Sequence, residues 1–296
     1  MKELVVISGK GGTGKTSIVA AFSALAKNAV LADCDVDAAD LHLVLDPKVK
    51  QTSDFSGGKQ AFIKSEECIG CGKCNELCRF DAIRLNGPAN SLIAKTYKVD
   101  PISCEGCKVC VEFCPEDAIA FSDSINGQWF ISDTRFGPMV HAKLGIAEEN
   151  SGKLVTLIRK AAKDIAQQQQ KDLLIIDGSP GIGCPVIASI TDADLVLIVT
   201  EPTLSGQHDL ERVLELAQGF NIPVLIVINK FDLNVNMSEK IEAMAHQRNT
   251  KVVGKIRYDE GFTKAQIMKC SVIEYTGGIV SEELRALWRN VIYALG

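Results

Sequence analysis

Short apolar segments recur along this chain and alternate with segments that have helical periodicity. The apolar segments are rich in β-branched residues and have no polar face, which is typical of strands covered on both sides. They predict strands at residues 4–7, 29–32, 173–176, 195–199 and 224–228. Apolar residues with a period near 3.6 predict helices at about 16–27, 154–166, 209–218 and 282–295. Because strands and helices alternate, we predict an α/β fold with a doubly wound, mostly parallel sheet.

One stretch of the chain, residues 61–123, interrupts this alternation. The pairs Gly57-Gly58 and Asn126-Gly127 flank it, and both are turn signals. We therefore predict a small α+β domain at 61–123 that is inserted into the α/β domain. The α/β domain would then consist of residues 1–60 and 124–296.

Composition limits the class of protein. The 296 residues are 46% hydrophobic and 23% charged, which are ordinary values for a globular protein with a sizeable core. The net charge of −5 argues against a general nucleic-acid binder. No apolar run approaches the ~20 residues that a membrane-spanning helix needs, and no secretory signal is evident. We expect a cytoplasmic protein without nucleic-acid or membrane partners.

A glycine-rich loop follows the first predicted strand and opens the first predicted helix. Its sequence is Gly9-Lys10-Gly11-Gly12-Thr13-Gly14-Lys15-Thr16. Glycines let successive backbone N–H groups converge on phosphate oxygens, and a helix N-terminus adds partial positive charge. We predict a phosphate-binding loop with a nucleotide contacted by Gly11, Gly12, Thr13, Gly14, Lys15, Thr16 and Ser17. In such a loop Lys15 reaches the β- and γ-phosphates and Thr16 binds Mg²⁺; the alternative is a glycine-rich turn with an unrelated lysine.

Eight of the 11 cysteines form two copies of one spacing, Cys-x2-Cys-x2-Cys-x3-Cys. The first copy is Cys68, Cys71, Cys74 and Cys78, and the second is Cys104, Cys107, Cys110 and Cys114. This spacing holds two [4Fe–4S] clusters, and the fourth cysteine of each run binds the other cluster. We therefore assign Cys68, Cys71, Cys74 and Cys114 to one cluster, and Cys104, Cys107, Cys110 and Cys78 to the second. Zinc fits this spacing less well, and disulfides would need an oxidising compartment.

Residues 62–122 resemble a bacterial 2[4Fe–4S] ferredoxin domain. The resemblance rests on the two cysteine runs and on the Asp-Ala-Ile that follows each of them, at Asp81 and at Asp117. Pro115 after the second run fits the bacterial pattern, whereas Arg79 after the first run departs from it.

The loop from Lys10 to Thr16 resembles the deviant Walker A motif of the MinD/ParA group of P-loop ATPases. That group includes the nitrogenase iron protein and the Mrp-type iron–sulfur carriers. The resemblance implies ATP hydrolysis with Mg²⁺ in a homodimer, in which Lys10 reaches the nucleotide of the partner subunit. Leu31–Asp35 is similar to the group's first switch, so Asp35 is expected to orient the attacking water, with Asp33 near the Mg²⁺.

Two further segments carry the same resemblance. Leu174–Gly178 resembles a Walker B motif, which implies that Asp177 holds Mg²⁺. Alone, these aspartates could also be strand-end residues that cap turns. Asn229-Lys230-Phe231-Asp232 has the form of the guanine-reading motif of GTPases, but an Asn at this strand end also contacts adenine in the MinD/ParA group. We favour ATP, with Asn229 and Asp232 at the base, beside the loop Lys255–Asp259 in which Arg257 replaces the family's usual Pro.

Three cysteines lie outside the runs. Cys184 stands seven residues after Asp177, the spacing at which the nitrogenase iron protein has a cluster-binding cysteine. It either binds or passes a cluster, or is a small buried thiol in a tight turn, and we favour the buried thiol. We expect Cys34 and Cys270 to be buried small residues.

These features predict an ATP-driven dimeric switch that is coupled to two [4Fe–4S] clusters. The leading hypothesis is ATP-dependent electron transfer to a redox partner protein. One alternative is an ATPase that assembles or carries iron–sulfur clusters or other metallocofactors, with an assembly protein as its partner. Another is a regulatory ATPase whose clusters are structural or sense redox state.

Overall fold

The computed structural model describes residues 1–145 and 152–296, and these form two compact units. The first unit contains Met1–Ser53, Trp129–Lys143 and residues 152–296. The second contains Asp54–Gln128 and residues 144–145. The second unit is therefore inserted within the sequence of the first, and it is longer than the 61–123 domain expected from the sequence.

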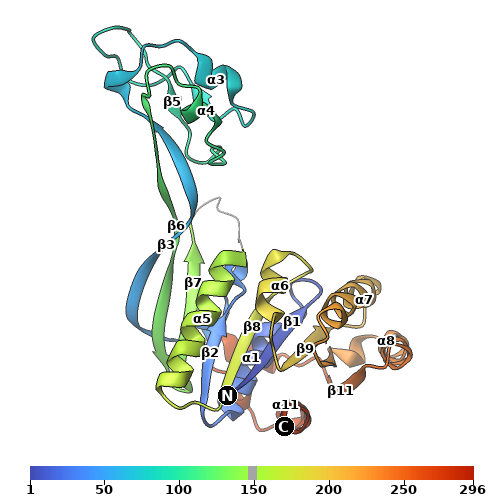
Figure 1. Cartoon of the computed structure of the whole chain (residues 1–296). Coiled ribbons are helices and arrows are strands. Elements are labelled where there is room, and N and C mark those ends of the chain that lie inside the picture. Colours follow the sequence, from blue (N-terminus) through green and yellow to red (C-terminus); the bar gives the residue numbers. More distant parts are fainter. Residues whose placement is uncertain (146–151) are drawn as a thin grey trace. The chain divides into compact units, whose positions relative to one another are not determined.

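A nine-stranded sheet has the order β11-β10-β9-β1-β8-β2-β7-β6-β3 within the described residues (Figure 1). The strands are β1 (Lys2–Ser8), β2 (Ala29–Asp33), β3 (Lys48–Ile63), β6 (Ile119–Thr134), β7 (Gly137–Leu144), β8 (Leu173–Pro180), β9 (Leu195–Thr200), β10 (Val224–Asn229) and β11 (Lys251–Ile256). Strands β11 to β7 of this order pair in parallel, and a tight turn joins β6 to β7. The predicted α/β fold with a mostly parallel sheet is confirmed.

The central strands are covered on both faces. Along β1, Leu4 and Val6 belong to a core cluster with helices α1 (Lys15–Leu25) and α11 (Ile279–Leu295), and Phe22 of α1 packs on Trp288 of α11. The alternating residues Val5 and Ile7 are also fully buried. Helices α5 (Gly152–Gln168), α6 (Cys184–Ile190), α7 (Leu204–Gly219) and α8 (Val235–Gln247) also pack along the strands. Burial on both faces explains why these strands have no polar side.

Several elements of the first unit had no clear signal in the sequence. They are the hairpin strands β6 and β7, the edge strands β3 and β11, and the helices α2 (Leu41–Leu45), α8, α9 (Gly261–Ile267) and α10 (Val272–Tyr275). Strand β3 is exposed along most of its length, so it lacks the apolar run that reveals a buried strand. Within the described residues, no helix is both long and apolar enough to cross a membrane.

The second unit contains one end of each of the long strands β3 and β6, together with several short elements. The short elements include the helices α3 (Lys73–Leu77) and α4 (Val109–Glu112) and an antiparallel pair, β4 (Ile83–Arg84) with β5 (Lys98–Val99). The small core of the unit joins Ile63, Ile83, Val99 and Ile119 to six of the eight cysteines of the two runs, whereas Cys71 and Cys107 are exposed. Because so few apolar side chains are available, the cysteines themselves make up much of the interior of this unit.

A buried histidine connects the two strands of the β6–β7 hairpin. His141 Nε2 lies 2.9 Å from Ser132 Oγ, and its ring stacks on Phe130 with centroids 5.1 Å apart. Burial and the nearby His42 lower the pKa of His141 to about 4.

We expect His141 to make stability depend on pH. The unfolded histidine has a pKa near 6.5, so below that pH the unfolded chain binds a proton that the folded chain does not accept until about pH 4. Stability is therefore full above about pH 6.5 and falls as the pH drops towards 4. From pH 7 to pH 5, the free energy of unfolding should fall by about 2 kcal/mol more in the wild type than in His141→Gln.

Urea unfolding at the two pH values tests this. His208→Gln is the matched control, because the His208 side chain is 71% exposed and should leave the wild-type pH dependence unchanged. An equal loss of stability in the wild type and in His141→Gln would contradict the assignment.

Candidate functional site

The glycine-rich loop runs from the end of β1 to the first turn of α1. Gly12 and Gly14 have φ of 80° and 91°, a region that favours glycine. A Cβ on Gly14 would lie 2.3 Å from Asn229 Nδ2. Gly14 precedes α1 directly, so the free N–H groups of the helix N-terminus open into the loop. The loop therefore has the backbone geometry and the local charge that suit a phosphate.

Lys15 is the first residue of α1, and its ammonium binds two carboxylates of its own chain. Its Nζ lies 2.6 Å from Asp177 Oδ1, at the end of β8, and 3.1 Å from Asp35 Oδ2, just after β2. The side chains of these residues are at most 10% exposed. Burial alone would lower the pKa of Lys15, but Asp177 and Asp35 outweigh it and raise the pKa above its ordinary value.

A third carboxylate, Asp33, lies beside this pair of contacts. It is fully buried and accepts hydrogen bonds from the backbone N–H groups of Asp35 and Leu41. Burial and the charge of Asp177 raise its pKa well above its usual range, against the opposing effect of Lys15. Burial also raises the pKa of Asp35. One ammonium thus faces three acidic groups, so the site has capacity for further positive charge.

Two buried oxygen atoms at this site have no hydrogen-bond partner within the described residues, Asp177 Oδ2 and Thr13 Oγ1. Carboxylate and hydroxyl oxygens are the ligands that Mg²⁺ prefers. The residues present therefore fit a magnesium ion with a bound triphosphate. Thr16 is half-buried in the first turn of α1, whereas Ser17 lines a separate small cavity with Phe262 and Cys270.

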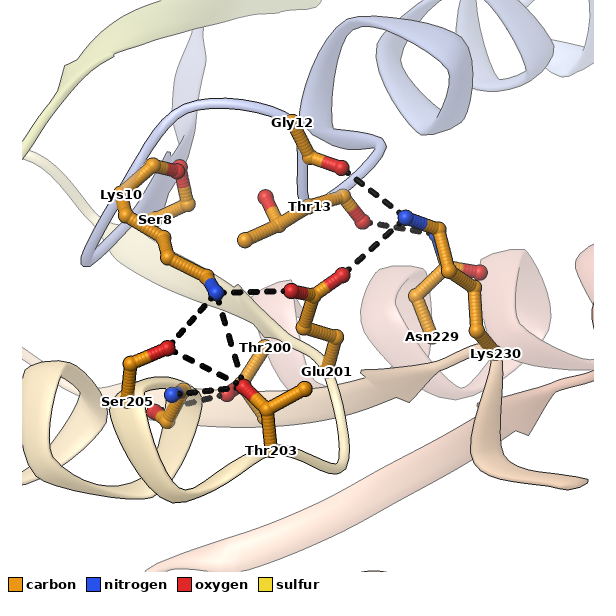
Figure 2. Close-up of polar contacts among 11 residues, drawn as sticks. Ser8, Lys10, Gly12, Thr13, Thr200, Glu201, Thr203, Ser205, Asn229 and Lys230 are labelled. Atoms are coloured by element: carbon orange, nitrogen blue, oxygen red, sulfur yellow. Dashed lines mark hydrogen bonds and ion pairs between the residues drawn. The ribbon is translucent and has the colours of Figure 1, made fainter. Parts of the chain in front are cut away.

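Two residues at the carboxyl end of β10 donate hydrogen bonds to the glycine-rich loop. Asn229 Nδ2 donates to the carbonyl of Thr13 at 2.7 Å, and Lys230 Nζ donates to the carbonyl of Gly12 at 3.0 Å (Figure 2). Asn229 Oδ1 is buried without a partner among the described residues, so it remains able to accept a hydrogen bond from a ligand.

Asp232 and Arg257, which we expected beside the base, are held by neighbouring elements. Asp232 Oδ1 accepts from the backbone N–H of Tyr258 at 2.7 Å, which ties the predicted base-binding segment to the loop after β11. Arg257, which stands where the family has Pro, binds Glu283 of α11 at 2.7 Å through its Nη2. The arginine therefore points to the last helix of the fold and has a structural partner there.

Lys10 is held within its own chain. Its Nζ lies 2.8 Å from Glu201 Oε1, 2.8 Å from Ser205 Oγ and 3.5 Å from Thr203 Oγ1 (Figure 2). Burial would raise the pKa of Glu201, but hydrogen bonds from Lys10 and Lys230 lower it overall. Sequence reasoning missed Glu201, Thr203 and Ser205. Their position directly after β9 could have identified them, because the other site residues also follow the carboxyl ends of parallel strands.

The eight repeated cysteines line two cavities in the second unit. Cys68, Cys71, Cys74 and Cys114 line one, and Cys78, Cys104, Cys107 and Cys110 line the other. Each cavity thus receives three cysteines from one run and the fourth from the other. All eight are free thiols. Burial raises the pKa of Cys74 to about 11 and also raises that of Cys110.

The backbone of the two cysteine runs repeats as well as the sequence. Gly72 and Lys108, which occupy matching places, have φ of 79° and 68°, and the matching Asp81 and Asp117 have φ of 49° and 48°. In the described residues, no three His, Cys, Asp or Glu side chains converge on a point that could hold a single metal ion. A [4Fe–4S] cluster is wider, because each thiolate binds a different iron, so this donor set fits such a cluster better than zinc.

Cys184 is exposed at the start of α6, so the favoured interpretation of a buried thiol is wrong. The loop between β8 and α6 leaves its outer residues in solvent, and Ile182 and Gly183 beside Cys184 are exposed too. Cys34 is fully buried, as expected, whereas Cys270 is only partly buried.

Comparisons with known proteins agree with this geometry. The sequence profile of the CobQ/CobB/MinD/ParA nucleotide binding domain matches residues 4–269. The uncharacterized protein MJ0578 of Methanocaldococcus jannaschii is 39% identical over 243 residues, which are 81% of this chain and 82% of that protein. The cell division ATPase MinD of Pyrococcus furiosus has a similar structure, with a TM-score of 0.58 and 16% identity over 99% of this chain and 98% of MinD.

A second solved structure has the same fold. MinD of Pyrococcus horikoshii, solved with Mg-ADP, matches with a TM-score of 0.59 and 16% identity over 98% of this chain and 95% of that chain. At this identity the likeness establishes the fold alone.

We predict that the charge of Lys15 stabilises the fold of the first unit. Lys15→Ala leaves Asp35 and Asp177 without a cation and should lower the free energy of unfolding by about 3–5 kcal/mol. In the double variant with Asp35→Asn, the loss should be smaller than the sum of the two single losses, because one unpaired charge is removed. Urea unfolding without nucleotide or metal measures both.

Lys27→Ala is the matched control, because Lys27 is exposed just after the same helix and should change stability by no more than about 0.5 kcal/mol. Additive losses in the double variant would show that Lys15 does not stabilise the Asp35 carboxylate.

Proposed function

This chain belongs to the CobQ/CobB/MinD/ParA nucleotide-binding family and is a P-loop ATPase of the MinD/ParA type, and from this premise we propose that it couples ATP hydrolysis to two [4Fe–4S] clusters. The reaction we favour is ATP-dependent electron transfer to a partner protein. The single observation that carries the proposal is the sorting of eight thiols into two cavities, each with three cysteines of one run and one of the other.

The surroundings of the thiols support this assignment. Ile63 and Ile119 line the first cavity, and Ala61, Phe80 and Ile83 line the second. These apolar walls limit the access of water to the cavities, although Cys71 in the first and Cys107 in the second are exposed. The solvent exposure of a cluster is one of the factors that set its potential. When bound, the clusters would supply one-electron redox chemistry, and the chain would hold them through the eight thiolates.

ATP is the nucleotide we assign, in line with the family. Lys15 and the glycine-rich loop would hold the phosphates, Thr16 and Asp177 the Mg²⁺, and Asp35 the attacking water. To receive a phosphate, the Lys15 ammonium would exchange its contacts with Asp35 and Asp177 for phosphate oxygens, and Mg²⁺ would then neutralise the freed carboxylates. Nucleotide binding would thus rearrange the ends of β2 and β8.

We propose a homodimer as the state that binds ATP. Shifting a two-state equilibrium from 1:99 to 99:1 requires about 5.5 kcal/mol of differential binding. A γ-phosphate and Mg²⁺ contacted by both subunits are a sufficient source of this energy. The loops that would respond to the nucleotide are those after Asp35 and Asp177.

A cluster carrier or assembly ATPase is the second candidate function, and the exposure of Cys184 favours it. A carrier needs a labile site in addition to permanent clusters, and Cys184 is a thiol outside the two runs that reaches solvent beside the Walker B strand. A transferred cluster at this position would need further thiolates, from a second subunit or from the recipient protein.

Iron analysis tests the cluster assignment. Anaerobically purified protein should contain about eight iron and eight sulfide per chain. Cys71→Ala and Cys107→Ala should each reduce the iron to about four, because each removes one ligand of one cluster. Cys270→Ala is the matched control and should retain the full complement. Zinc in place of iron, or no metal at all, would refute the proposal.

Cys184→Ala separates the two candidate functions. For an electron-transfer protein, this variant should keep about eight iron per chain and an unchanged ATP turnover. Reconstitution of the wild type with excess iron and sulfide should then bind no additional cluster. If the wild type binds more iron than Cys184→Ala, the carrier function is supported instead.

Coupling between the two chemistries can be measured directly. ATP turnover should change at least several-fold when the clusters are reduced, and Lys15→Ala should abolish turnover while leaving the iron content near eight. Equal turnover in the oxidised and reduced protein would exclude coupling.

A further inference from the structure

We propose that Glu201 is a positioning residue for Lys10. Its carboxylate holds the Lys10 ammonium on its own subunit, and so restrains the lysine from reaching a second subunit. The inference rests on the proposed ATP-bound homodimer. It identifies the contact between Glu201 and Lys10 as one that must break before the homodimer forms. Glu201 follows β9 directly, and its side chain is 15% exposed.

The two oxygens of Glu201 bind different lysines. Oε1 lies 2.8 Å from Lys10 Nζ, and Oε2 lies 3.0 Å from Lys230 Nζ (Figure 2). Lys230 also donates to the carbonyl of Gly12 at 3.0 Å, so the carboxylate is tied to the glycine-rich loop through Lys230. One side chain therefore joins three segments that are far apart in sequence.

The Lys10 ammonium uses all of its hydrogen-bonding capacity within its own chain. A lysine ammonium has three donors, and the acceptors around Lys10 are Glu201, Ser205 and Thr203. For Lys10 to bind a phosphate in another subunit, these contacts must be exchanged for phosphate oxygens. The charge-assisted contact with Glu201 is the strongest of the three, because Ser205 and Thr203 offer neutral hydroxyls.

The backbone around Glu201 keeps this arrangement in place. Thr203 Oγ1 accepts from the backbone N–H of Gly206 at 2.9 Å and caps α7. A Cβ on Gly206 would lie 2.3 Å from the Glu201 carbonyl oxygen, so the turn is closely packed. Strand β9 and helix α7 therefore fix the backbone that carries Glu201, whereas Lys10 lies on the glycine-rich loop.

A competing anion is required to release Lys10. Glu201 carries one negative charge, and ATP carries more negative charge than ADP because of its γ-phosphate, so ATP is the stronger competitor for the same ammonium. Glu201 would thereby make closure of the dimer depend on the γ-phosphate. Within the described residues, its side chain contacts Lys10 and Lys230 and not Asp35 or Asp177, so the role we assign is positioning and not catalysis.

Glu201→Gln tests this with two independent measurements, made on the anaerobically purified full-length protein. The first is the rate at which an amine-reactive ester acylates Lys10 without nucleotide, followed by mass spectrometry. We expect a rate at least threefold above that of the wild type, with Lys27 as an internal reference. Glu215→Gln is the matched control, because Glu215 lies on α7 and makes a surface ion pair with Arg248.

The second measurement is dimerisation by analytical ultracentrifugation with ADP and with ATP. Glu201→Gln should tighten the dimer about tenfold in ADP and narrow the difference between ADP and ATP. In a Lys10→Ala background the same substitution should have no effect, because the lysine that it restrains is absent. Glu215→Gln should behave as the wild type in both nucleotides.

The outcomes separate this inference from the proposed function. Unchanged acylation of Lys10 in Glu201→Gln would overturn the inference, whatever the state of association. Faster acylation with unchanged dimerisation in ADP would also overturn it, because the contact would then not control closure. Failure of the wild type to dimerise with ATP would instead refute the proposed homodimer, and the acylation rates would still report whether Glu201 holds Lys10.

Discussion

The ATPase unit depends on the buried ammonium of Lys15 at the carboxyl edge of its sheet. Strands β2 and β8 are in register so that Asp33 lies beside Asp177, and with Asp35 they concentrate negative charge where the backbone turns away from the sheet. Unpaired charges at these depths would be costly, and the Lys15 ammonium compensates them from the first turn of α1. The same lysine that would bind a phosphate therefore stabilises this edge of the sheet. In the proposed ATP-bound state, Mg²⁺ would take the place of the lysine as the source of positive charge beside these carboxylates.

The sequence allowed the buried half of this architecture to be predicted. Strands β1, β8, β9 and β10 contain continuous apolar runs because helices cover both of their faces. Such runs are typical of strands that are buried on both sides, so these strands could be located in the sequence. Strands β3 and β6 were missed because most of their side chains are exposed or only partly buried, which gives no periodic signal. The position of Lys10 could not be predicted either. The motif that contains Lys10 implies a contact with the nucleotide of a partner subunit. In the structure this lysine is paired with Glu201, a residue that no motif identified.

For the cysteines, spacing contains information on how the side chains are grouped but little on how exposed each thiol is. The spacing alone suggested how the eight cysteines divide into two sets of four. Three closely spaced thiolates can bind one cluster, and the fourth cysteine of each run binds the other cluster. The two cavities have the same division of side chains. Exposure of single thiols was less predictable. Cys34 directly follows β2 and is fully buried, but Cys184 is the exposed first residue of α6, and spacing contains no information on the path of the loop that leads to it.

The two outermost strands of the sheet, β11 and β3, have unpaired backbone groups along their free sides. Both present lysines there or nearby, with Lys251 and Lys255 on β11 and Lys48 and Lys50 on β3. Charged side chains on an edge strand oppose the addition of a strand from another molecule. A wide sheet that could otherwise extend from chain to chain is thus protected against fibrous aggregation at each end.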